Sequence, residues 1–337
     1  MTPTILLTHS PHALENYYGD RALRGLRELG DVRLNPGADP TTPEALIHLA
    51  QGCHIIVSSR LAAAPAAVFD ALPDLVAFCR VAVDIRNIDV DAASRNGVLV
   101  TRATPGFDAS VAEWVVGAMI DASRHISRAA SAYWTGQPAP VVMGRELRGA
   151  TVGIIGHGHI GSYLARITQA LGMQVLVQDP QAQTLAAGMR QVDLDTLLAA
   201  SDYVVCLAPA LPETANLMGR AAYARMKPDA IFINASRGEL VDEEALRDAL
   251  DRGVIAGCAL DVGRAQDQMP SPWLAAHPRV IATPHVGGLT PQAAEHQAMD
   301  TVEQVRAIVT GAEPPHAVNA AHATRLRRLD RSSGTGK

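Results

Sequence analysis

The sequence lacks the features of a secreted, membrane-spanning or disulfide-stabilised protein. Its four cysteines (Cys53, Cys79, Cys206 and Cys258) show no C-x-x-C spacing, which is typical of buried thiols in a reducing compartment. The first residues contain no basic segment followed by a long apolar core, so we expect no signal peptide. No uninterrupted apolar run is long enough to span a bilayer. We therefore expect a soluble, cytoplasmic protein.

A strong excess of either charge is also absent. The 337 residues include 29 Lys and Arg against 34 Asp and Glu, so nothing indicates nucleic acid or an anionic membrane as a partner. Hydrophobic residues, in contrast, make up 48% of the chain. That supply is enough for two hydrophobic cores, because single cores stop growing at about 250–300 residues.

A glycine-rich turn between two apolar strands is the most informative stretch. Residues 151–179 read TVGIIGHGHIGSYLARITQALGMQVLVQD. Gly156 permits the tight turn, Gly158 lets backbone approach a pyrophosphate, and Gly161 lets the following helix pack closely. The helix N-terminus offers unpaired N–H groups to phosphates, while the Asp179 carboxylate can bind ribose hydroxyls and would repel a 2′-phosphate. The stretch predicts a Rossmann unit that binds NAD.

Short apolar runs alternate with amphipathic segments along nearly the whole chain, which favours parallel sheets flanked by helices. We expect an α/β protein with two doubly wound parallel-sheet domains. A Rossmann-type NAD domain (103–289) is inserted into a flavodoxin-like substrate domain (1–102 and 290–324), and a single long helix over 109–133 precedes the glycine turn. Residues 325–337 are polar, contain Gly and Ser, and are expected to form a disordered tail.

Three further predicted strands end in residues that can carry chemistry. One ends in the segment Ala235–Gly238, where Arg237 could bind a carboxylate with both arms and polarise a carbonyl. The same side chain could instead form a surface ion pair with an acidic neighbour. Asp261 closes the next strand, near the place expected for a nicotinamide ring. His285 follows the third strand and a proline, and glycines beyond it allow close contact.

Together these segments resemble the D-isomer-specific 2-hydroxyacid dehydrogenases. The resemblance covers about 75–319 and is densest in the strings MKPDAIFINASRGELVDEEAL and TPHVGGLT. It implies hydride transfer between NAD and a small D-2-hydroxy acid or 2-keto acid, and a homodimer built around the cofactor domain. It assigns carboxylate and carbonyl binding to Arg237 and the acid/base role to His285. Besides the turn glycines, the NAD contacts that it implies are His159, Ile160, Asp179, Ala235, Ser236, Arg237, Asp261, His285 and Gly288.

One departure from the family pattern concerns the partner of His285. The family normally places a Glu after the Leu-Asp-Val segment to hold the His ring, and counting from Asp261 puts Gln266 at that position. A neutral amide can orient an imidazole but cannot stabilise imidazolium by charge. We expect Gln266 to orient His285 as part of the catalytic set, or Asp267 if the loop is shifted. Formate dehydrogenases of the family also carry Gln at this position, so a formate dehydrogenase-like enzyme is a further alternative. We expect it less, because the sequence does not show the extended N-terminal segment of those enzymes.

A second departure lies in the expected substrate loop. The family usually shows a glycine-rich turn whose backbone N–H groups bind the substrate carboxylate, whereas this chain reads RVAVDIRNID over 80–89. Asp84 replaces a glycine and Arg86 replaces the usual acid. We expect Val83, Asp84 and Arg86 to face the substrate. Either Asp84 and Arg86 form a local ion pair beside an ordinary substrate, or they select one with amine, amide or hydroxyl groups.

A binding protein is the main alternative to an enzyme. A nucleotide-sensing or corepressor-like protein could retain this fold and lose turnover, and the changed Glu and Gly positions leave that reading open. The pairs His9/His12 and His157/His159 have spacings that superficially suggest metal ligands. Because the second pair occupies the phosphate turn, where a cation would compete with the cofactor, we expect no metal site.

Overall fold

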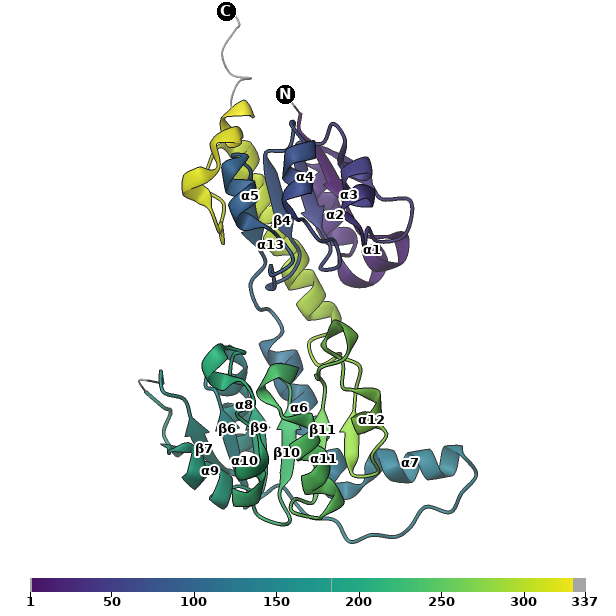
Figure 1. Ribbon diagram of the computed structural model, residues 1–337, viewed down its shortest axis with the longest axis vertical. Coiled ribbons are helices and arrows are strands. Elements are labelled where there is room, and N and C mark those ends of the chain that lie inside the picture. Colours follow the sequence, from purple (N-terminus) through teal and green to yellow (C-terminus); the bar gives the residue numbers. More distant parts are fainter. Residues whose placement is uncertain (1, 183, 330–337) are drawn as a thin grey trace, which may run out of the picture. The chain divides into compact units, whose positions relative to one another are not determined.

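The computed structural model describes residues 2–182 and 184–329, and it divides them into two compact units (Figure 1). Unit 1 contains the residues up to Gly106 and those from Thr290 onward, and unit 2 is Phe107–Leu289. Each unit is built on a sheet whose strands all pair in parallel, with five strands in unit 1 and seven in unit 2. The predicted α/β class with two doubly wound parallel sheets is confirmed. Among the described residues, no helix combines the length and apolar character needed to cross a bilayer.

The sheet of unit 1 has the order β2-β1-β3-β4-β5. Its strands are β1 (Thr4–Leu7), β2 (Asp31–Leu34), β3 (Ile55–Ser58), β4 (Ala77–Arg80) and β5 (Leu99–Arg102), and its helices are α1 (Pro11–Tyr17), α2 (Asp20–Arg27), α3 (Pro43–Ala50), α4 (Ala66–Ala71), α5 (Val90–Arg95) and α13 (Pro291–Thr310). Alternate strand residues serve two cores: Leu7 packs with α2 and α13, whereas Leu6 packs with α3, α4 and α5. The strand order reverses between β1 and β3, so a ligand site is expected at their carboxyl ends.

The sheet of unit 2 has the order β12-β11-β10-β9-β6-β7-β8. Its strands are β6 (Thr151–Ile155), β7 (Gln174–Gln178), β8 (Met189–Gln191), β9 (Tyr203–Cys206), β10 (Ile231–Asn234), β11 (Gly257–Leu260) and β12 (Val280–Ala282), and its helices are α6 (Asp108–Arg124), α7 (Ile126–Trp134), α8 (His159–Ala170), α9 (Leu194–Ala200), α10 (Arg220–Arg225), α11 (Glu243–Asp251) and α12 (Pro272–Ala275). One face packs against α6 and α8, and the other packs against α9 to α12 (Figure 1). The order reverses between β6 and β9, which places the glycine turn after β6 at the switch point.

The long helix predicted over 109–133 is two helices. His125 takes a left-handed backbone conformation (φ 56°) between α6 and α7. Its N–H donates to the Asp121 carbonyl (2.7 Å), and the Asp121 carboxylate accepts the N–H of Ser127 (2.8 Å). A left-handed residue ends an α-helix, and His is a weak signal for one because Gly usually fills that position.

The predicted disordered tail is wrong for residues 325–329. Thr324–Arg328 forms a short 3₁₀ helix, and Leu326 packs against the core of unit 1. The Arg325 guanidinium donates to the carbonyls of Leu72 (2.9 Å) and Leu75 (3.0 Å). The charged end of Arg325 therefore satisfies main-chain acceptors within the fold. The rest of that prediction, residues 330–337, lies outside the described residues.

Candidate active site

The turn after β6 has the backbone of a phosphate-binding loop. Gly156 has a φ of +96°, and a Cβ on it would lie 2.7 Å from the backbone nitrogen of Ala208, in the loop after β9. A Cβ on Gly161 would overlap the Gly156 carbonyl oxygen. A Cβ on Gly158, in contrast, would meet no atom within 4 Å. Gly158 is the N-cap residue of α8, and no side chain caps this helix end. Two of the glycines are therefore required by the fold, and the third leaves space for a pyrophosphate at a helix N-terminus.

This difference between the glycines predicts a contrast between two variants. We expect Gly161→Ala to lower the free energy of unfolding by about 1–3 kcal/mol, because the methyl group meets backbone atoms. Gly158→Ala should change it by less than about 1 kcal/mol. The same Gly158→Ala variant should weaken NADH binding by about tenfold, because the added methyl group occupies the space expected for the pyrophosphate. Urea unfolding and fluorescence titration measure the two effects, and unchanged NADH binding in Gly158→Ala would contradict this role.

Asp179 follows β7 and lies beside the glycine turn. Its carboxylate accepts the backbone N–H of His157 (2.7 Å) on one oxygen and that of Gln181 (2.8 Å) on the other. The Gln191 amide donates to its carbonyl oxygen (2.9 Å). These bonds hold the carboxylate in place, and each oxygen keeps acceptor capacity for a hydroxyl group. The contact of Asp179 with a ribose stays a prediction.

Arg237 lies in the loop that follows the carboxyl end of β10, and hydrogen bonds hold this loop. The Asn234 amide is fully buried; it donates to the Arg237 carbonyl (3.0 Å) and accepts the N–H of Ser236 (3.1 Å). The half-buried Arg237 guanidinium donates to the Ser236 carbonyl (2.7 Å). Gly238 follows, and a Cβ on it would overlap the backbone of Gly263 in the loop after β11. The backbones of these two loops are therefore in close contact, and this contact fixes the backbone that carries Arg237.

Asp261, at the end of β11, is 3% exposed and organises the loop that carries His285. Its carboxylate accepts the hydroxyl of Thr283 (2.6 Å) and the N–H groups of Val286 (2.8 Å) and Gly287 (2.7 Å). Its carbonyl accepts the N–H of His285 (2.9 Å). The structure thus gives Asp261 a loop-holding role, and a contact with NAD stays a prediction.

One of the two ring nitrogens of His285 forms a hydrogen bond. Nδ1 lies 3.0 Å from the main-chain carbonyl oxygen of Asp267. Because a carbonyl only accepts, Nδ1 carries the proton of this bond. Nε2 then holds either a lone pair or, in the imidazolium form, a second proton. This arrangement suits a group that accepts a proton in one direction of a reaction and donates it in the other.

The prediction that Gln266 orients His285 is wrong. Gln266 is exposed, and its side-chain amide forms no hydrogen bond with any residue that the structure describes. The short 3₁₀ segment Gln266–Gln268 passes through left-handed conformations at Asp267 (φ 57°) and Gln268 (φ 59°), which turns the Asp267 carbonyl toward the ring. The alternative position, Asp267, makes the contact, but through its backbone rather than its carboxylate.

The predicted substrate residues Val83, Asp84 and Arg86 lie in unit 1, in the loop after β4. The Arg86 guanidinium donates two hydrogen bonds to the Asp84 carboxylate, from Nε to Oδ1 (3.1 Å) and from Nη2 to Oδ2 (2.7 Å). Of the two alternatives for this pair, a local ion pair is present. Both side chains are exposed, so the pair adds little stability, but it balances the charge of Asp84.

The same loop keeps backbone donors without acceptors. The carbonyls of Arg80 and Ala82 both accept the N–H of Ala103 (3.0 and 3.1 Å). The N–H groups of Ala82 and Val83, in contrast, have no hydrogen-bond acceptor among the described residues. Ala82 is buried and Val83 is half-buried, so an anion at this turn would supply the missing acceptor.

Sequence reasoning missed the polar groups buried beneath this loop. Arg80 and Ser58 are fully buried at the ends of β4 and β3, and Ser59 is 6% exposed. His9, which follows β1, is 3% exposed. The available signal was a charged residue that closes the buried run Phe78-Cys79-Arg80.

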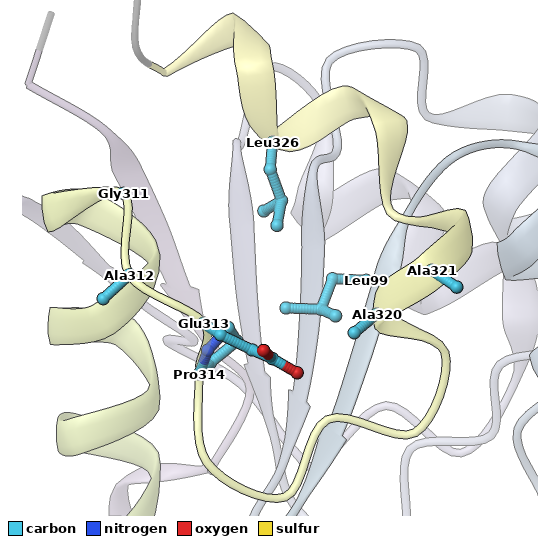
Figure 2. Close-up of a pocket in the computed structure, with 8 residues that line it drawn as sticks. All are labelled: Leu99, Gly311, Ala312, Glu313, Pro314, Ala320, Ala321 and Leu326. Carbon is cyan, nitrogen blue, oxygen red and sulfur yellow. The ribbon is translucent and has the colours of Figure 1, made fainter.

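A cavity of about 460 Å³ lies elsewhere in unit 1 (Figure 2). Its walls come from Leu99, at the amino end of β5, from the segment after α13, and from Leu326. Glu313 supplies the titratable group among the lining residues. Ligands of open α/β sheets bind at the carboxyl ends of strands, so this cavity is not the candidate site. In the part of the chain that is described, no three His, Cys, Asp or Glu side chains gather to hold a metal.

Comparisons with known proteins agree with this arrangement. Residues 116–287 match the model of the D-isomer specific 2-hydroxyacid dehydrogenase, NAD binding domain. The D-3-phosphoglycerate dehydrogenase of Synechocystis sp. is 38% identical over 244 residues, which is 71% of this chain and 44% of that protein. The hydroxypyruvate reductase of Thermotoga maritima is 34% identical over 243 residues, 71% of this chain and 79% of that protein.

The likeness extends to solved structures. The D-lactate dehydrogenase of Lactobacillus jensenii, solved with NAD⁺, superposes with a TM-score of 0.80 at 27% identity, covering 94% of this chain and 99% of that one. The chain spans about half the length of the curated phosphoglycerate dehydrogenases that it matches. The resemblance seen in the sequence is confirmed, and the chain belongs to the D-isomer-specific 2-hydroxyacid dehydrogenase family.

Proposed function

We propose that this protein is an NAD-dependent oxidoreductase that transfers a hydride between nicotinamide and a small D-2-hydroxy acid or its 2-keto acid. The observation that carries the proposal is the placement of Arg237 and His285 after β10 and β12, with the His285 Nδ1 held by a carbonyl and Nε2 left to exchange a proton. The relatives are named as dehydrogenases and reductases, so a binding protein without turnover is not favoured.

NAD fits the residues of unit 2. The open space at Gly158 and the uncapped first turn of α8, with His159 and Ile160, suit a pyrophosphate. Asp179 would accept the ribose hydroxyls and repel a 2′-phosphate, which favours NAD over NADP. The loops Ala235–Arg237 and His285–Gly288 would bind the nicotinamide half. When bound, the cofactor supplies the hydride acceptor or donor.

The residues of the chain would handle the substrate and its proton. The N–H groups of Ala82 and Val83 would bind the carboxylate. Arg237 would also bind the carboxylate and would polarise the keto oxygen, stabilising the negative charge that develops as the carbon is reduced. Nε2 of His285 would donate a proton to that oxygen, and in the oxidation direction it would take the hydroxyl proton. The Asp267 carbonyl orients the ring for this transfer but adds no full charge to stabilise the imidazolium.

The proposal also assigns the parts of the chain. Residues 103–289 bind NAD, and residues 1–102 with 290–324 bind the substrate. All four cysteines are free and buried, which supports a reducing, cytoplasmic location. Near-balanced charge supports a small molecule rather than nucleic acid as the partner.

The direct test is oxidation of NADH with a panel of 2-keto acids, followed by absorbance. The panel contains glyoxylate, hydroxypyruvate, pyruvate and bulkier branched and aromatic acids, with NADPH as the control cofactor. We expect turnover with at least one acid and a clear preference for NADH. Tight NADH binding without turnover of any acid would contradict the proposed activity.

We infer a homodimer that forms through α7 and the segment after it. Tyr133 is 71% exposed and Trp134 84%, and Val141 and Met143 of the following segment are also exposed. An apolar group of this size on a surface marks a protein–protein interface. Sedimentation should give twice the 35.6 kDa chain mass for the wild type. Trp134→Asp should shift the protein toward monomer, whereas Leu171→Asp, at an exposed leucine after α8, should not. A monomeric wild type would overturn the inference.

A further inference from the structure

The guanidinium of Arg80 is buried in unit 1 without an acidic partner. Arg80 is 0% exposed, and its two Nη atoms donate to the carbonyls of Ser59 and Ala62 (2.7 Å) and to the Asn87 amide oxygen (2.8 Å). All of these acceptors are neutral, and no carboxylate of the described residues lies within ion-pair distance of it. Burial lowers the pKa of Arg80 to about 10, and the Asp84 carboxylate partly opposes this shift, so Arg80 keeps its charge at neutral pH. A buried charge without a counter-ion is costly and favours an anion nearby.

Other buried groups around this cation also lack partners. The Nε–H of Arg80, the hydroxyls of Ser58 and Ser59 and the Nδ1 of His9 form no hydrogen bonds with the residues that the structure describes. Ser58 pairs with Arg80 across β3 and β4, and the N–H of Ser59 donates to Thr8 after β1 (2.8 Å). Burial lowers the pKa of His9 to about 4; the Asp39 carboxylate opposes this shift and the charge of Arg80 adds to it, so His9 is neutral at pH 7. The carboxyl ends of β1, β3 and β4 are thus rich in unpaired polar groups, and the nearest carboxylates, Asp39 and Asp84, are half-buried and exposed rather than buried beside Arg80.

The loop that starts at Arg80 is the candidate carboxylate loop. Its far end is Asn87, which Arg80 holds by a hydrogen bond, so one guanidinium ties both ends of the loop. The N–H groups of Ala82 and Val83 lack acceptors, as described above. Asp84 and Arg86 cancel each other's charge in their ion pair. The net charge of the three ionised side chains is therefore the single positive charge of Arg80.

We propose that Arg80 is the positioning residue that makes this loop select a substrate carboxylate. It holds the loop by hydrogen bonds to both sides, and its buried charge strengthens anion binding at the backbone donors above it, because charges interact more strongly where water is excluded. The inference rests on the proposed function and adds the reason why an anionic keto acid is preferred over a neutral analogue.

The test compares a 2-keto acid that the enzyme reduces with its uncharged methyl ester. Arg80→Met removes the charge and keeps most of the length of the side chain. Arg80→Lys keeps the positive charge but replaces the planar guanidinium, with its several donors, by a single ammonium group. In Arg80→Met we expect KM for the acid to rise about tenfold or more, with a smaller effect on kcat, and the acid-to-ester ratio of kcat/KM to fall by the same factor. Arg80→Lys should recover most of that ratio. Arg95→Met, on the exposed side of α5, is the matched control and should match the wild type.

A purely structural role for Arg80 would lower activity toward acid and ester alike, and that result would overturn the inference. Ser58→Asp provides a second route if Arg80→Met does not fold, because it places a carboxylate beside Arg80 and cancels its charge. The acid-to-ester ratio should then fall as well, and an unchanged ratio would also overturn the inference.

Oxalate binding separates this inference from the proposed function. Calorimetry with the NADH complex should show oxalate binding to the wild type and weaker binding to Arg80→Met. Equal binding to both proteins would remove the role of Arg80 and leave the proposed function in place. A wild type that reduces no keto acid and binds no oxalate would overturn both.

Discussion

Replacing His285 by Asn should lower kcat for the preferred 2-keto acid by about 10²–10⁴-fold, the usual contribution of a positioned acid or base. The Nε2 nitrogen of His285 exchanges the proton in the proposed reaction, and the amide of Asn cannot take that role. Steady-state kinetics with saturating NADH measures this loss. The affinity for NADH, followed by fluorescence, should change much less, because the glycine turn and Asp179 lie on other strands.

His48→Asn is the matched control for this prediction. His48 is exposed on α3 in unit 1, and its replacement should leave kcat within about twofold of the wild type, as expected for a surface substitution. Full activity of His285→Asn across the working pH range would show that another group transfers the proton.

Arg237→Ala should lower kcat/KM for the keto acid by about 10³-fold or more, because it removes both a carboxylate contact and the donor that stabilises the developing oxyanion. Arg237→Lys should retain only part of the activity, since an ammonium group cannot reproduce the planar fork. The loss should appear in both KM and kcat, whereas removal of a ground-state contact alone would raise KM only.

Arg220→Ala is the control for charge removal in the same unit. Arg220 begins α10 and pairs at the surface with Asp248, so its loss should leave kcat/KM nearly unchanged. If Arg237→Ala retained both turnover and oxalate binding, the role assigned to Arg237 would be wrong.

The fold class, the family and the residues that end each functional strand follow from the sequence alone. The apolar strand, the three glycines and Asp179 lie within one segment of 29 residues, 151–179, so their geometry follows from local backbone rules. The alternation of apolar and amphipathic segments is likewise a local signal, and both sheets followed from it. Even the ion pair of Asp84 and Arg86 was one of two stated alternatives, because residues two positions apart in a turn can meet.

The groups that support these residues become visible only in the folded chain. The ring of His285 is held by the backbone carbonyl of Asp267, which the left-handed conformations of Asp267 and Gln268 turn toward it. Counting positions along the sequence from Asp261 indicates the side chain of Gln266 instead. Arg80 reads as an ordinary strand-ending charge until the packing of β3 and β4 buries it without a counter-ion. The physical reason is the same in both cases. A residue's chemistry is local to the sequence, whereas its partners, burial and unsatisfied donors depend on segments that meet only in the folded chain.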